Sequence, residues 1–112
     1  NYKTKDGTAV RDYIHVSDIA LGHISAINYL SKNCFSVFNL GSGSGFTVME
    51  VIKEFEKILK IKIPIKFTKR RIGDAGISYS NIASAKKNLK WKPKKNLSTL
   101  CKDTYEWSRN NY

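Results

Sequence analysis

Segments with the apolar pattern of strands are followed along this chain by segments in which apolar residues recur every three or four positions. This succession restricts the possible folds more than any other feature of the sequence. Three segments, 10–16, 36–40 and 61–67, have the length and residue types of strands. Apolar residues at intervals of three and four, together with helix start signals, predict helices between and after them. The predicted helices span residues 18–31, 47–60, 81–89 and 97–109. Because helices separate the strands, we predict an α/β fold with a small, largely parallel sheet and flanking helices.

The same spacing assigns side chains to the interior. In the helix over residues 18–31, the apolar stripe that includes Ile24, Ile27 and Leu30 is expected to face inward. In the last helix, Trp107 lies on the predicted inward face. A three-stranded sheet is small, so its two faces are expected to need material from outside these 112 residues.

A glycine-rich turn connects the second predicted strand to a helix. Residues 41–45 read Gly-Ser-Gly-Ser-Gly, and Thr47 and Glu50 have the spacing of a capping box. A strand, a glycine turn and a helix start form the context in which backbone N–H groups bind phosphate. The dinucleotide fingerprint is incomplete, because Phe46 stands where the third glycine is needed. We expect a turn whose helix start lies near a ligand, and the alternative is a plain flexible connection.

A second candidate site is the basic loop of residues 70–74, which reads Arg-Arg-Ile-Gly-Asp. Arginine presents a planar fork that matches phosphate oxygens, and a carboxylate accepts hydrogen bonds from vicinal hydroxyls such as those of ribose. One loop could therefore hold both halves of a nucleoside diphosphate, and the alternative is an internal Arg–Asp ion pair on the surface. Arg11 supplies a further guanidinium, and Tyr13 lies on the same face of the first predicted strand.

The positive charge of the chain is large and uneven. The net charge is +11, and residues 53–102 alone hold fifteen basic and three acidic residues. A basic half of this kind could attract a nucleic acid, a membrane surface or an anionic small molecule. Sixteen of the twenty basic residues are lysines, and dispersed lysines are typical of a solvated surface. A polyanion- or nucleic-acid-binding module is therefore the alternative to a small-molecule site.

Several classes of protein are excluded by what the sequence lacks. Cys34 and Cys101 are far apart and have no His or Cys at ligand spacing, which excludes a zinc finger or a dense disulfide scaffold. No metal site is expected. The chain has no run of 18 apolar residues, which rules out a transmembrane helix. Familiar nucleophile and acid–base motifs are also missing, so no catalytic residue is expected in this chain.

Several of these motifs together resemble one enzyme family along the whole chain. Asp6-Gly7-Thr8 and then residues 11–20, Arg-Asp-Tyr-Ile-His-Val-Ser-Asp-Ile-Ala, strongly resemble the C-terminal part of the UDP-glucose 4-epimerases. These enzymes are extended short-chain dehydrogenase/reductases. The similarity continues through further stretches, which are residues 38–43, 48–51, 70–74, 89–93 and 103–107.

The resemblance implies that the N-terminal half of such an enzyme is missing here. In the family that half carries the NAD-binding fingerprint and the catalytic Tyr-x-x-x-Lys, so the implied NAD site lies outside this chain. The family oxidises sugar C4 and returns the hydride to the opposite face. Residues 1–112 would form one C-terminal UDP-sugar-binding region, inactive alone, with residues 10–40 on the Rossmann side. The implied parent is a cytoplasmic homodimer that binds a UDP-sugar, with no nucleic acid or membrane partner.

The resemblance also implies roles for individual residues. Arg11 and Arg71 match the diphosphate ligands of the family, and Asp74 matches the carboxylate on the ribose hydroxyls. Tyr13 matches a contact to the phosphate or ribose, and Val48 matches a contact beside the nucleotide.

Ser78 stands where the family varies a residue of the sugar pocket. A large aromatic residue there restricts the enzyme to glucose and galactose, whereas a small residue admits N-acetylated sugars. Since serine is small, the parent enzyme is expected to accept UDP-N-acetylglucosamine as well.

Overall fold

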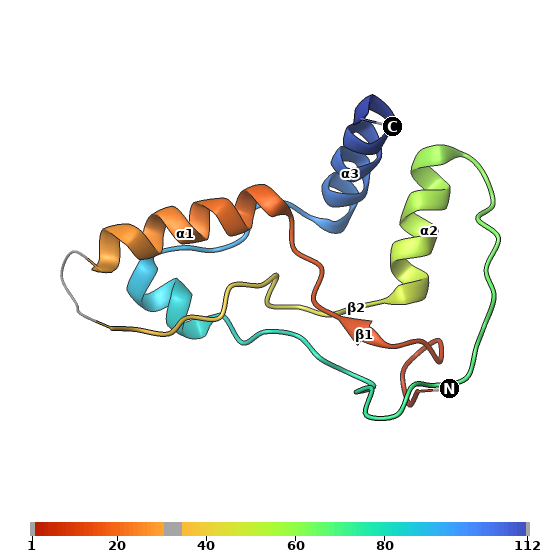
Figure 1. Ribbon diagram of the computed structural model, residues 1–112, viewed down its shortest axis with the longest axis horizontal. Coiled ribbons are helices and arrows are strands. Elements are labelled where there is room, and N and C mark those ends of the chain that lie inside the picture. The colour runs from red at the N-terminus through yellow and green to blue at the C-terminus, as the bar shows by residue number, and fades with distance from the viewer. Residues whose placement is uncertain (1, 31–34, 112) are drawn as a thin grey trace.

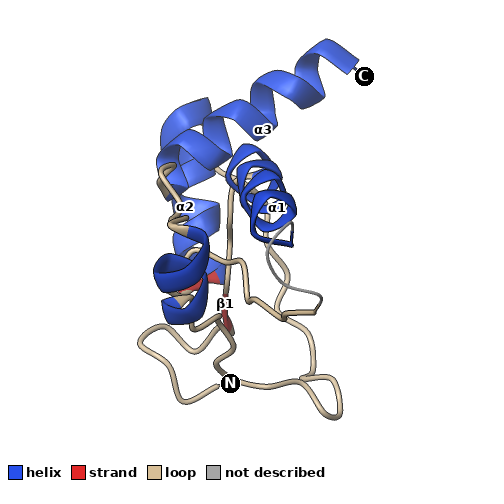
Figure 2. Ribbon diagram, turned by 90° about the vertical axis from the view of Figure 1, so that its left-hand side faces the viewer, coloured by secondary structure: helices blue, strands red, loops and turns tan. Residues whose placement is uncertain are grey.

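A computed structural model describes residues 2–30 and 35–111 of the chain. Two very short strands, β1 (Val10–Arg11) and β2 (Phe46–Thr47), lie at its centre. The helices are α1 (Val16–Leu30), α2 (Val48–Leu59), the short π-helix η1 (Ala85–Leu89) and α3 (Leu97–Asn111). Helix α1 and η1 lie on one side of the strands, and α2 and α3 lie on the other (Figure 1). The long loops gather with the N-terminus at one end of the molecule, away from α3 (Figure 2).

The main core forms where α1 packs on η1 and on the segment that follows it. Ile82, Ala85, Leu89 and Trp91 are buried there. Side chains from the first half of the chain pack around them, and these are Ile14, Ala26, Tyr29, Phe38 and Leu40. Gly22 lets α1 pack closely against Leu40, because a Cβ at that position would lie 2.7 Å from a Leu40 methyl carbon.

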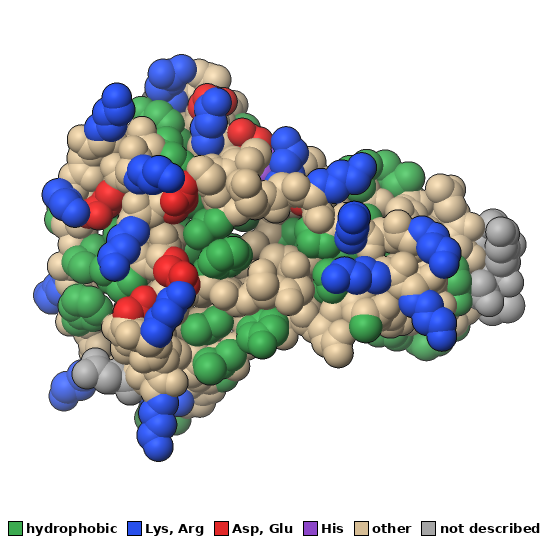
Figure 3. Space-filling model, turned by 180° about the vertical axis from the view of Figure 1, so that it is seen from behind, with side chains coloured by type: hydrophobic (Ala, Val, Ile, Leu, Met, Phe, Trp, Pro, Cys, Tyr) green, Lys and Arg blue, Asp and Glu red, His purple; other side chains and the backbone are tan. Residues whose placement is uncertain are grey.

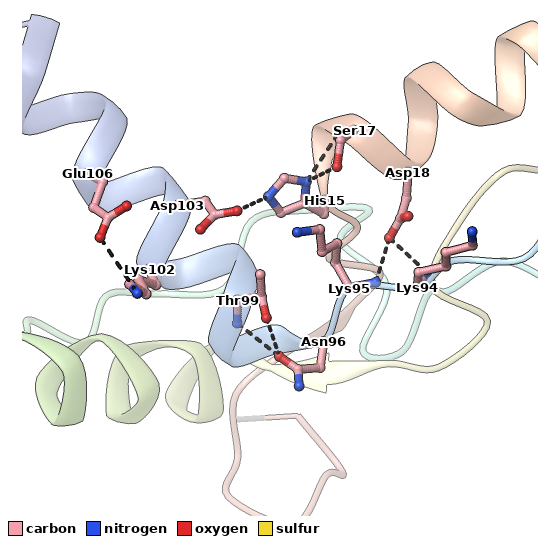
Figure 4. A network of polar contacts seen from close by, with 10 residues as sticks. All are labelled: His15, Ser17, Asp18, Lys94, Lys95, Asn96, Thr99, Lys102, Asp103 and Glu106. Carbon is pink, nitrogen blue, oxygen red and sulfur yellow. Dashed lines mark hydrogen bonds and ion pairs between the residues drawn. The ribbon is translucent and has the colours of Figure 1, made fainter.

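Polar contacts fix the start of α1 against the C-terminal segments (Figure 4). Asp18 is 2% exposed, and its carboxylate accepts hydrogen bonds from the backbone N–H groups of Lys94 and Lys95. The His15 ring lies between α1 and α3, where Nδ1 accepts from the Ser17 N–H at 3.1 Å. Because Nδ1 accepts, neutral His15 carries its proton on Nε2 and donates to Asp103 at 3.0 Å. His15 therefore joins the two helices.

The predicted capping box opens α2 as expected. The Thr47 hydroxyl accepts from the Glu50 N–H at 3.1 Å, and the Glu50 carboxylate accepts from the Thr47 N–H at 2.8 Å. The helix ends at Lys60, which has the left-handed φ of 56°. Helix α2 packs against α3, where Cys101 is fully buried. Burial raises the pKa of the Cys101 thiol, and the nearby Glu54 carboxylate raises it further. Cys34 lies outside the described residues.

The α/β class is confirmed, but the prediction of a largely parallel three-stranded sheet is wrong for the described residues. The two strands pair antiparallel, with Val10 opposite Thr47, and one isolated parallel bridge joins Val10 to Ile77. Residues 36–40 and 61–67 form no ladder with another described strand. A strand exists only through its partner, and sequence alternation alone does not supply one.

The predicted inward face of α1 is also wrong, because it points to solvent. Ile24, Ile27 and Leu30 are 55%, 67% and 49% exposed, whereas the buried residues of this helix are Asp18 and Gly22. In α3 the predicted face is correct at Cys101, which is buried, and wrong at Trp107, which is 59% exposed. The predicted inward faces of α1 and of the far end of α3 are therefore not covered by the described part of the chain.

Global dimensions agree with this incomplete burial. The accessible surface is 8440 Å², against about 6200 Å² for a compact monomer of the same mass. The radius of gyration is 16.6 Å, against about 13 Å for a compact domain of this length. The chain thus exposes more surface than its length requires.

Candidate binding site

A cleft lies beside β1, where three distant parts of the chain meet. It is lined by the N-terminal segment, by the first turns of α2 and by the loop of residues 65–74. Five lining residues are cationic, namely Arg11, Lys66, Lys69, Arg70 and Arg71, whereas the lining carboxylate is Asp74. A cleft with this charge balance attracts an anion.

Arg11, Arg71 and Asp74 come together in this cleft from segments about 60 residues apart. The Arg11 Nη2 group forms an ion pair with Asp74 Oδ1, and its Nη1 donates to the carbonyl of Val10 at 2.8 Å. The nearest Arg71 nitrogen lies 3.7 Å from Asp74 Oδ2. The Arg11 side chain is 29% exposed and the Arg71 side chain 86%. The structure thus places a half-buried guanidinium and an exposed guanidinium at ion-pair distance from one carboxylate.

Sequence reasoning missed a fourth member of the cluster. The Tyr2 hydroxyl donates a hydrogen bond to Asp74 Oδ2 at 2.5 Å. The Arg70 guanidinium lies over the Tyr2 ring, 4.7 Å from its centroid, and its Nε donates to the Asp74 carbonyl at 3.2 Å. Tyr2 and Asp74 are 72 positions apart, and no motif in the sequence links them. Only the folded chain reveals this contact.

The cluster keeps Asp74 ionised. The hydrogen bond from Tyr2 lowers the pKa of the Asp74 carboxyl most, and the charges of Arg11 and Arg71 lower it further. The same hydrogen bond raises the pKa of the Tyr2 hydroxyl. At neutral pH, Tyr2 is therefore a donor and Asp74 an acceptor.

Two more of the residues singled out in the sequence line the cleft, and one does not. Val48, the first residue of α2, lies in its wall, as does Tyr13, whose pKa is raised by burial. Ser78 is exposed and does not line the cleft formed by the described residues. Its backbone N–H donates to the Val10 carbonyl at 3.0 Å, which places it on the opposite side of β1 from β2.

The start of α2 lies at the cleft, but its N–H groups are already bonded. The N–H of Val48 donates to the Ala9 carbonyl, that of Met49 to the Thr8 hydroxyl, and that of Glu50 to Thr47. A helix start binds phosphate through free N–H groups. The guanidinium groups, rather than the start of the helix, are therefore the groups of this cleft that could donate to an anion.

The glycine turn likewise serves packing. Asp12 accepts hydrogen bonds from the backbone N–H groups of Ser42 and Ser80, at 2.7 and 2.9 Å. A Cβ at Gly41 would lie 2.2 Å from the Asp12 carboxylate, and one at Gly45 would lie 2.3 Å from Val10. The turn binds an internal carboxylate, so it does not fit a dinucleotide phosphate. These glycines allow the turn to pack against β1.

The basic side chains outside the cleft do not gather into one patch on the face of the molecule shown in Figure 3. Lysine and arginine side chains are dispersed across that face, with acidic and apolar side chains between them. Among residues 2–30 and 35–111, no group of three or more acidic, His or Cys residues is placed to hold a metal ion. None of the helices in these residues is both long and apolar enough to cross a membrane.

Comparison with known sequences relates the chain to one group of enzymes. UDP-glucose 4-epimerase 2 of Arabidopsis thaliana is 46% identical over 113 residues, which cover 99% of this chain and 32% of that protein. The UDP-glucose 4-epimerase of Pasteurella multocida is 44% identical over 112 residues, or 33% of its length. The chain thus spans about a third of the length of these relatives and corresponds to their C-terminal third. No family model matches the chain.

Solved structures agree with the sequence comparison. A UDP-glucose 4-epimerase from Bifidobacterium longum, in complex with NAD+ and UDP, matches 98% of this chain with a TM-score of 0.92 and 41% identity. The UDP-Glc/GlcNAc 4-epimerase from Campylobacter jejuni matches 97% with a TM-score of 0.87 and 38% identity. In each case the chain covers 33% of the solved structure. The fold is that of the C-terminal part of an extended short-chain dehydrogenase/reductase.

Proposed function

We propose that this chain is the UDP-binding C-terminal part of an NAD-dependent UDP-sugar 4-epimerase. The observation that carries the proposal is the convergence of Arg11, Arg71 and Asp74 in one cleft, in a chain 42–47% identical to UDP-glucose 4-epimerases. The relatives are three times as long, so the activity belongs to the complete protein and not to these 112 residues.

The chemistry of the cleft fits a nucleoside diphosphate. Arg11 uses one nitrogen for Asp74 and one for the Val10 carbonyl, so part of its five-donor fork remains free for an anion. The exposed Arg71 side chain is free to close on a second phosphate group. Asp74 stays ionised and accepts hydrogen bonds, which suits the two hydroxyls of ribose. Val48 and Tyr13 supply the walls beside the nucleotide.

The proposed division of labour follows from what the described residues lack. The N–H of Ser42 in the glycine turn donates to Asp12, and the N–H groups of Val48 and Met49 at the start of α2 are also bonded, so NAD binding is assigned to the part of the enzyme outside this chain. Bound there, NAD would accept a hydride from sugar C4 and return it to the opposite face. The residues of this chain hold the UDP group while that exchange takes place.

We infer that the described residues between positions 10 and 40 lie on the side of the chain that meets the rest of the enzyme. Ile24, Ile27 and Leu30 of α1 are exposed, and Phe35 and Val37 beyond the helix are 83% and 74% exposed. Residues 35–40 follow α1 without a strand partner in the described chain. An apolar helix face beside an unpaired segment fits the edge of a larger α/β sheet. We assign the N-terminal, Rossmann part of the enzyme to this surface.

Ser78 supports a wider choice of sugar. Its small side chain is exposed, and its backbone is hydrogen-bonded to β1. A matched relative from Campylobacter jejuni is named as a UDP-Glc/GlcNAc 4-epimerase. In the complete protein, Ser78→Tyr should abolish turnover of UDP-N-acetylglucosamine and preserve that of UDP-glucose. The idea fails if the unmodified enzyme does not turn over UDP-N-acetylglucosamine.

The proposed function is tested by assaying the full-length protein that carries this sequence. With NAD supplied, it should interconvert UDP-glucose and UDP-galactose, and UDP should inhibit competitively. Absence of both interconversion and UDP binding would refute the proposal.

Salt dependence separates this proposal from a polyanion-binding module. Binding to a nucleic acid weakens steeply with salt, with a slope of about one per phosphate contact. UDP has two phosphates, so its binding should have a shallow slope, and duplex DNA should not displace it. A steep slope, with displacement of UDP by DNA, would favour the module instead.

A further inference from the structure

Tyr2 holds together the loop that carries Asp74. Its backbone N–H donates to the Gly7 carbonyl at 3.0 Å, which anchors the residue at the base of the N-terminal segment. Its hydroxyl donates to Asp74 Oδ2, and its ring supports the guanidinium of Arg70. A Cβ at Gly76 would lie 3.2 Å from the Tyr2 ring, so the chain beyond Asp74 also packs closely on it. One side chain thus contacts the loop at three points.

The contacts of Asp74 leave a specific set of acceptor positions open. A carboxylate has about four lone-pair directions, two on each oxygen. Arg11 occupies one on Oδ1, and Tyr2 occupies one on Oδ2. Arg71, at 3.7 Å, lies beyond hydrogen-bond distance. One acceptor position therefore remains on each oxygen, and the two together match a pair of vicinal hydroxyl donors.

The contacts around Tyr2 give the neighbouring residues Arg70 and Arg71 different surroundings. Arg70 stacks on the Tyr2 ring and donates to the Asp74 carbonyl, so its charge is held against the loop. Arg71, its neighbour in the sequence, remains exposed toward the cleft. Tyr2 thereby determines which of two adjacent arginines stays available to a ligand.

We propose that Tyr2 is a positioning residue for nucleotide recognition, which fixes the Asp74 carboxylate so that its two open acceptors face the 2′ and 3′ hydroxyls of ribose. This inference rests on the proposed function and adds a residue to it. Tyr2 acts through Asp74, and it contributes to binding of the ribose rather than to the chemistry at the sugar.

The test uses the full-length protein and compares UDP with 2′-deoxy-UDP by calorimetric titration. Tyr2→Phe keeps the ring under Arg70 and removes only the hydroxyl. We expect it to raise the dissociation constant of UDP about three- to tenfold, the usual effect of losing one hydrogen bond. Its effect on 2′-deoxy-UDP should be smaller, because that ligand lacks one of the hydroxyls that Asp74 accepts from. The kcat for the UDP-sugar should not change.

Two further variants separate positioning from a general structural effect. In an Asp74→Asn background, Tyr2→Phe should cause no further loss, because the carboxylate through which it acts is gone. Tyr105→Phe removes a tyrosine hydroxyl on α3, outside the cleft, and should leave both dissociation constants unchanged.

Three outcomes would overturn the inference. The first is an equal loss for UDP and 2′-deoxy-UDP, which would indicate general loosening of the loop. The second is an unchanged or lower dissociation constant for UDP, which would mean that the Tyr2 hydroxyl does not assist binding or that it competes with the ribose for Asp74. The third is full additivity with Asp74→Asn. If the unmodified protein does not bind UDP, the proposed function itself fails, and the two failures are thus distinguishable.

Discussion

At the scale of single residues, the cleft pairs a restrained arginine with a free one. Arg11 is part of β1 and is held by Asp74 and by its own strand, so little side-chain freedom remains for it to lose on binding. Arg71 lies on an exposed loop and must become ordered when the ligand arrives. Under the proposed function, Arg11 would provide a fixed geometry, and Arg71 would provide a charge that can follow the phosphate.

This difference leads to a prediction for Arg71→Ala in the complete enzyme. A charge-assisted hydrogen bond contributes about 1.5–3 kcal/mol, so KM for the UDP-sugar should rise about 10- to 150-fold. The kcat should change little, because UDP is held alike in the ground and transition states. Steady-state kinetics measure both quantities. Arg109→Ala, at the end of α3, serves as the control and should behave as wild type. An unchanged KM would remove Arg71 from the site.

The residue types of the site could be predicted from the sequence, but their contacts could not. Arginine and aspartate within five residues indicate phosphate and ribose, because few other side chains combine these geometries. The ion pair between Arg11 and the same carboxylate was not predicted, because 63 positions separate the two residues in the sequence. Tyr2 carried no signal, because its partner lies 72 positions away in the sequence.

At the scale of elements, local signals predicted the helices well and the strands poorly. Helix α2 begins at its capping box and ends near Lys60, because both ends depend on neighbouring residues. The predicted strands depend on distant partners, and only residues 10–11 of the first one pair in the described chain. The His15 and Asp18 contacts that join α1 to the C-terminal segments are also long-range, and they were not predicted.

Asp12, which follows β1, accepts hydrogen bonds from the segments around Ser42 and Ser80. Its ionisation should therefore make the stability of the fold depend on pH. Burial alone would raise the pKa of this carboxyl, but the hydrogen bonds from Ser42 and Ser80 outweigh it and lower the pKa. The unfolded chain, with an ordinary pKa of about 4, then binds the proton more readily. The stabilisation from ionised Asp12 is therefore complete above about pH 4 and is lost as the pH falls through the folded value.

Asp12→Asn tests this. We expect it to lower the free energy of unfolding of the full-length protein by about 1–3 kcal/mol at pH 7, because the amide donor opposes backbone donors. The loss should shrink as the pH falls below about 4, because the unfolded wild-type chain takes up the proton first and the folded carboxylate takes it up only at a lower pH. Denaturant titrations at pH 7 and at the lowest pH at which the protein stays folded measure this. The control is Glu106→Gln, at an exposed position of α3. The account would be contradicted if the difference in stability between wild type and Asp12→Asn grew as the pH falls.

At the scale of the whole molecule, the chain has the surface of a part and not of a complete domain. Its excess of about 2200 Å² over a compact monomer is of the size that obligate interfaces bury. The apolar stripe of α1, which the sequence predicts to face the protein interior, is exposed. The described residues alone do not cover this stripe, which agrees with the proposal that it packs against another part of the enzyme.

If the apolar stripe of α1 is covered in the complete protein, a charge placed on it should be destabilising. Ile27→Lys should destabilise the full-length protein by about 2 kcal/mol or more, because an isoleucine covered by the missing part is replaced by a buried charge. The control is Ile72→Lys, at a fully exposed loop isoleucine, which should stay within about 0.5 kcal/mol of wild type. Thermal or denaturant unfolding measures both. Equal, small effects at the two sites would show that α1 faces water in the complete protein.

The central claim is that Arg11, Arg71 and Asp74 of this chain together grip the UDP group. The most direct test is a crystal structure of the full-length protein with UDP bound. The account predicts diphosphate oxygens within about 3 Å of guanidinium nitrogens of Arg11 and Arg71, and ribose hydroxyls at the same distance from the Asp74 carboxylate. UDP bound elsewhere, with the Arg11–Asp74 ion pair intact and no nucleotide contact to either residue, would contradict it.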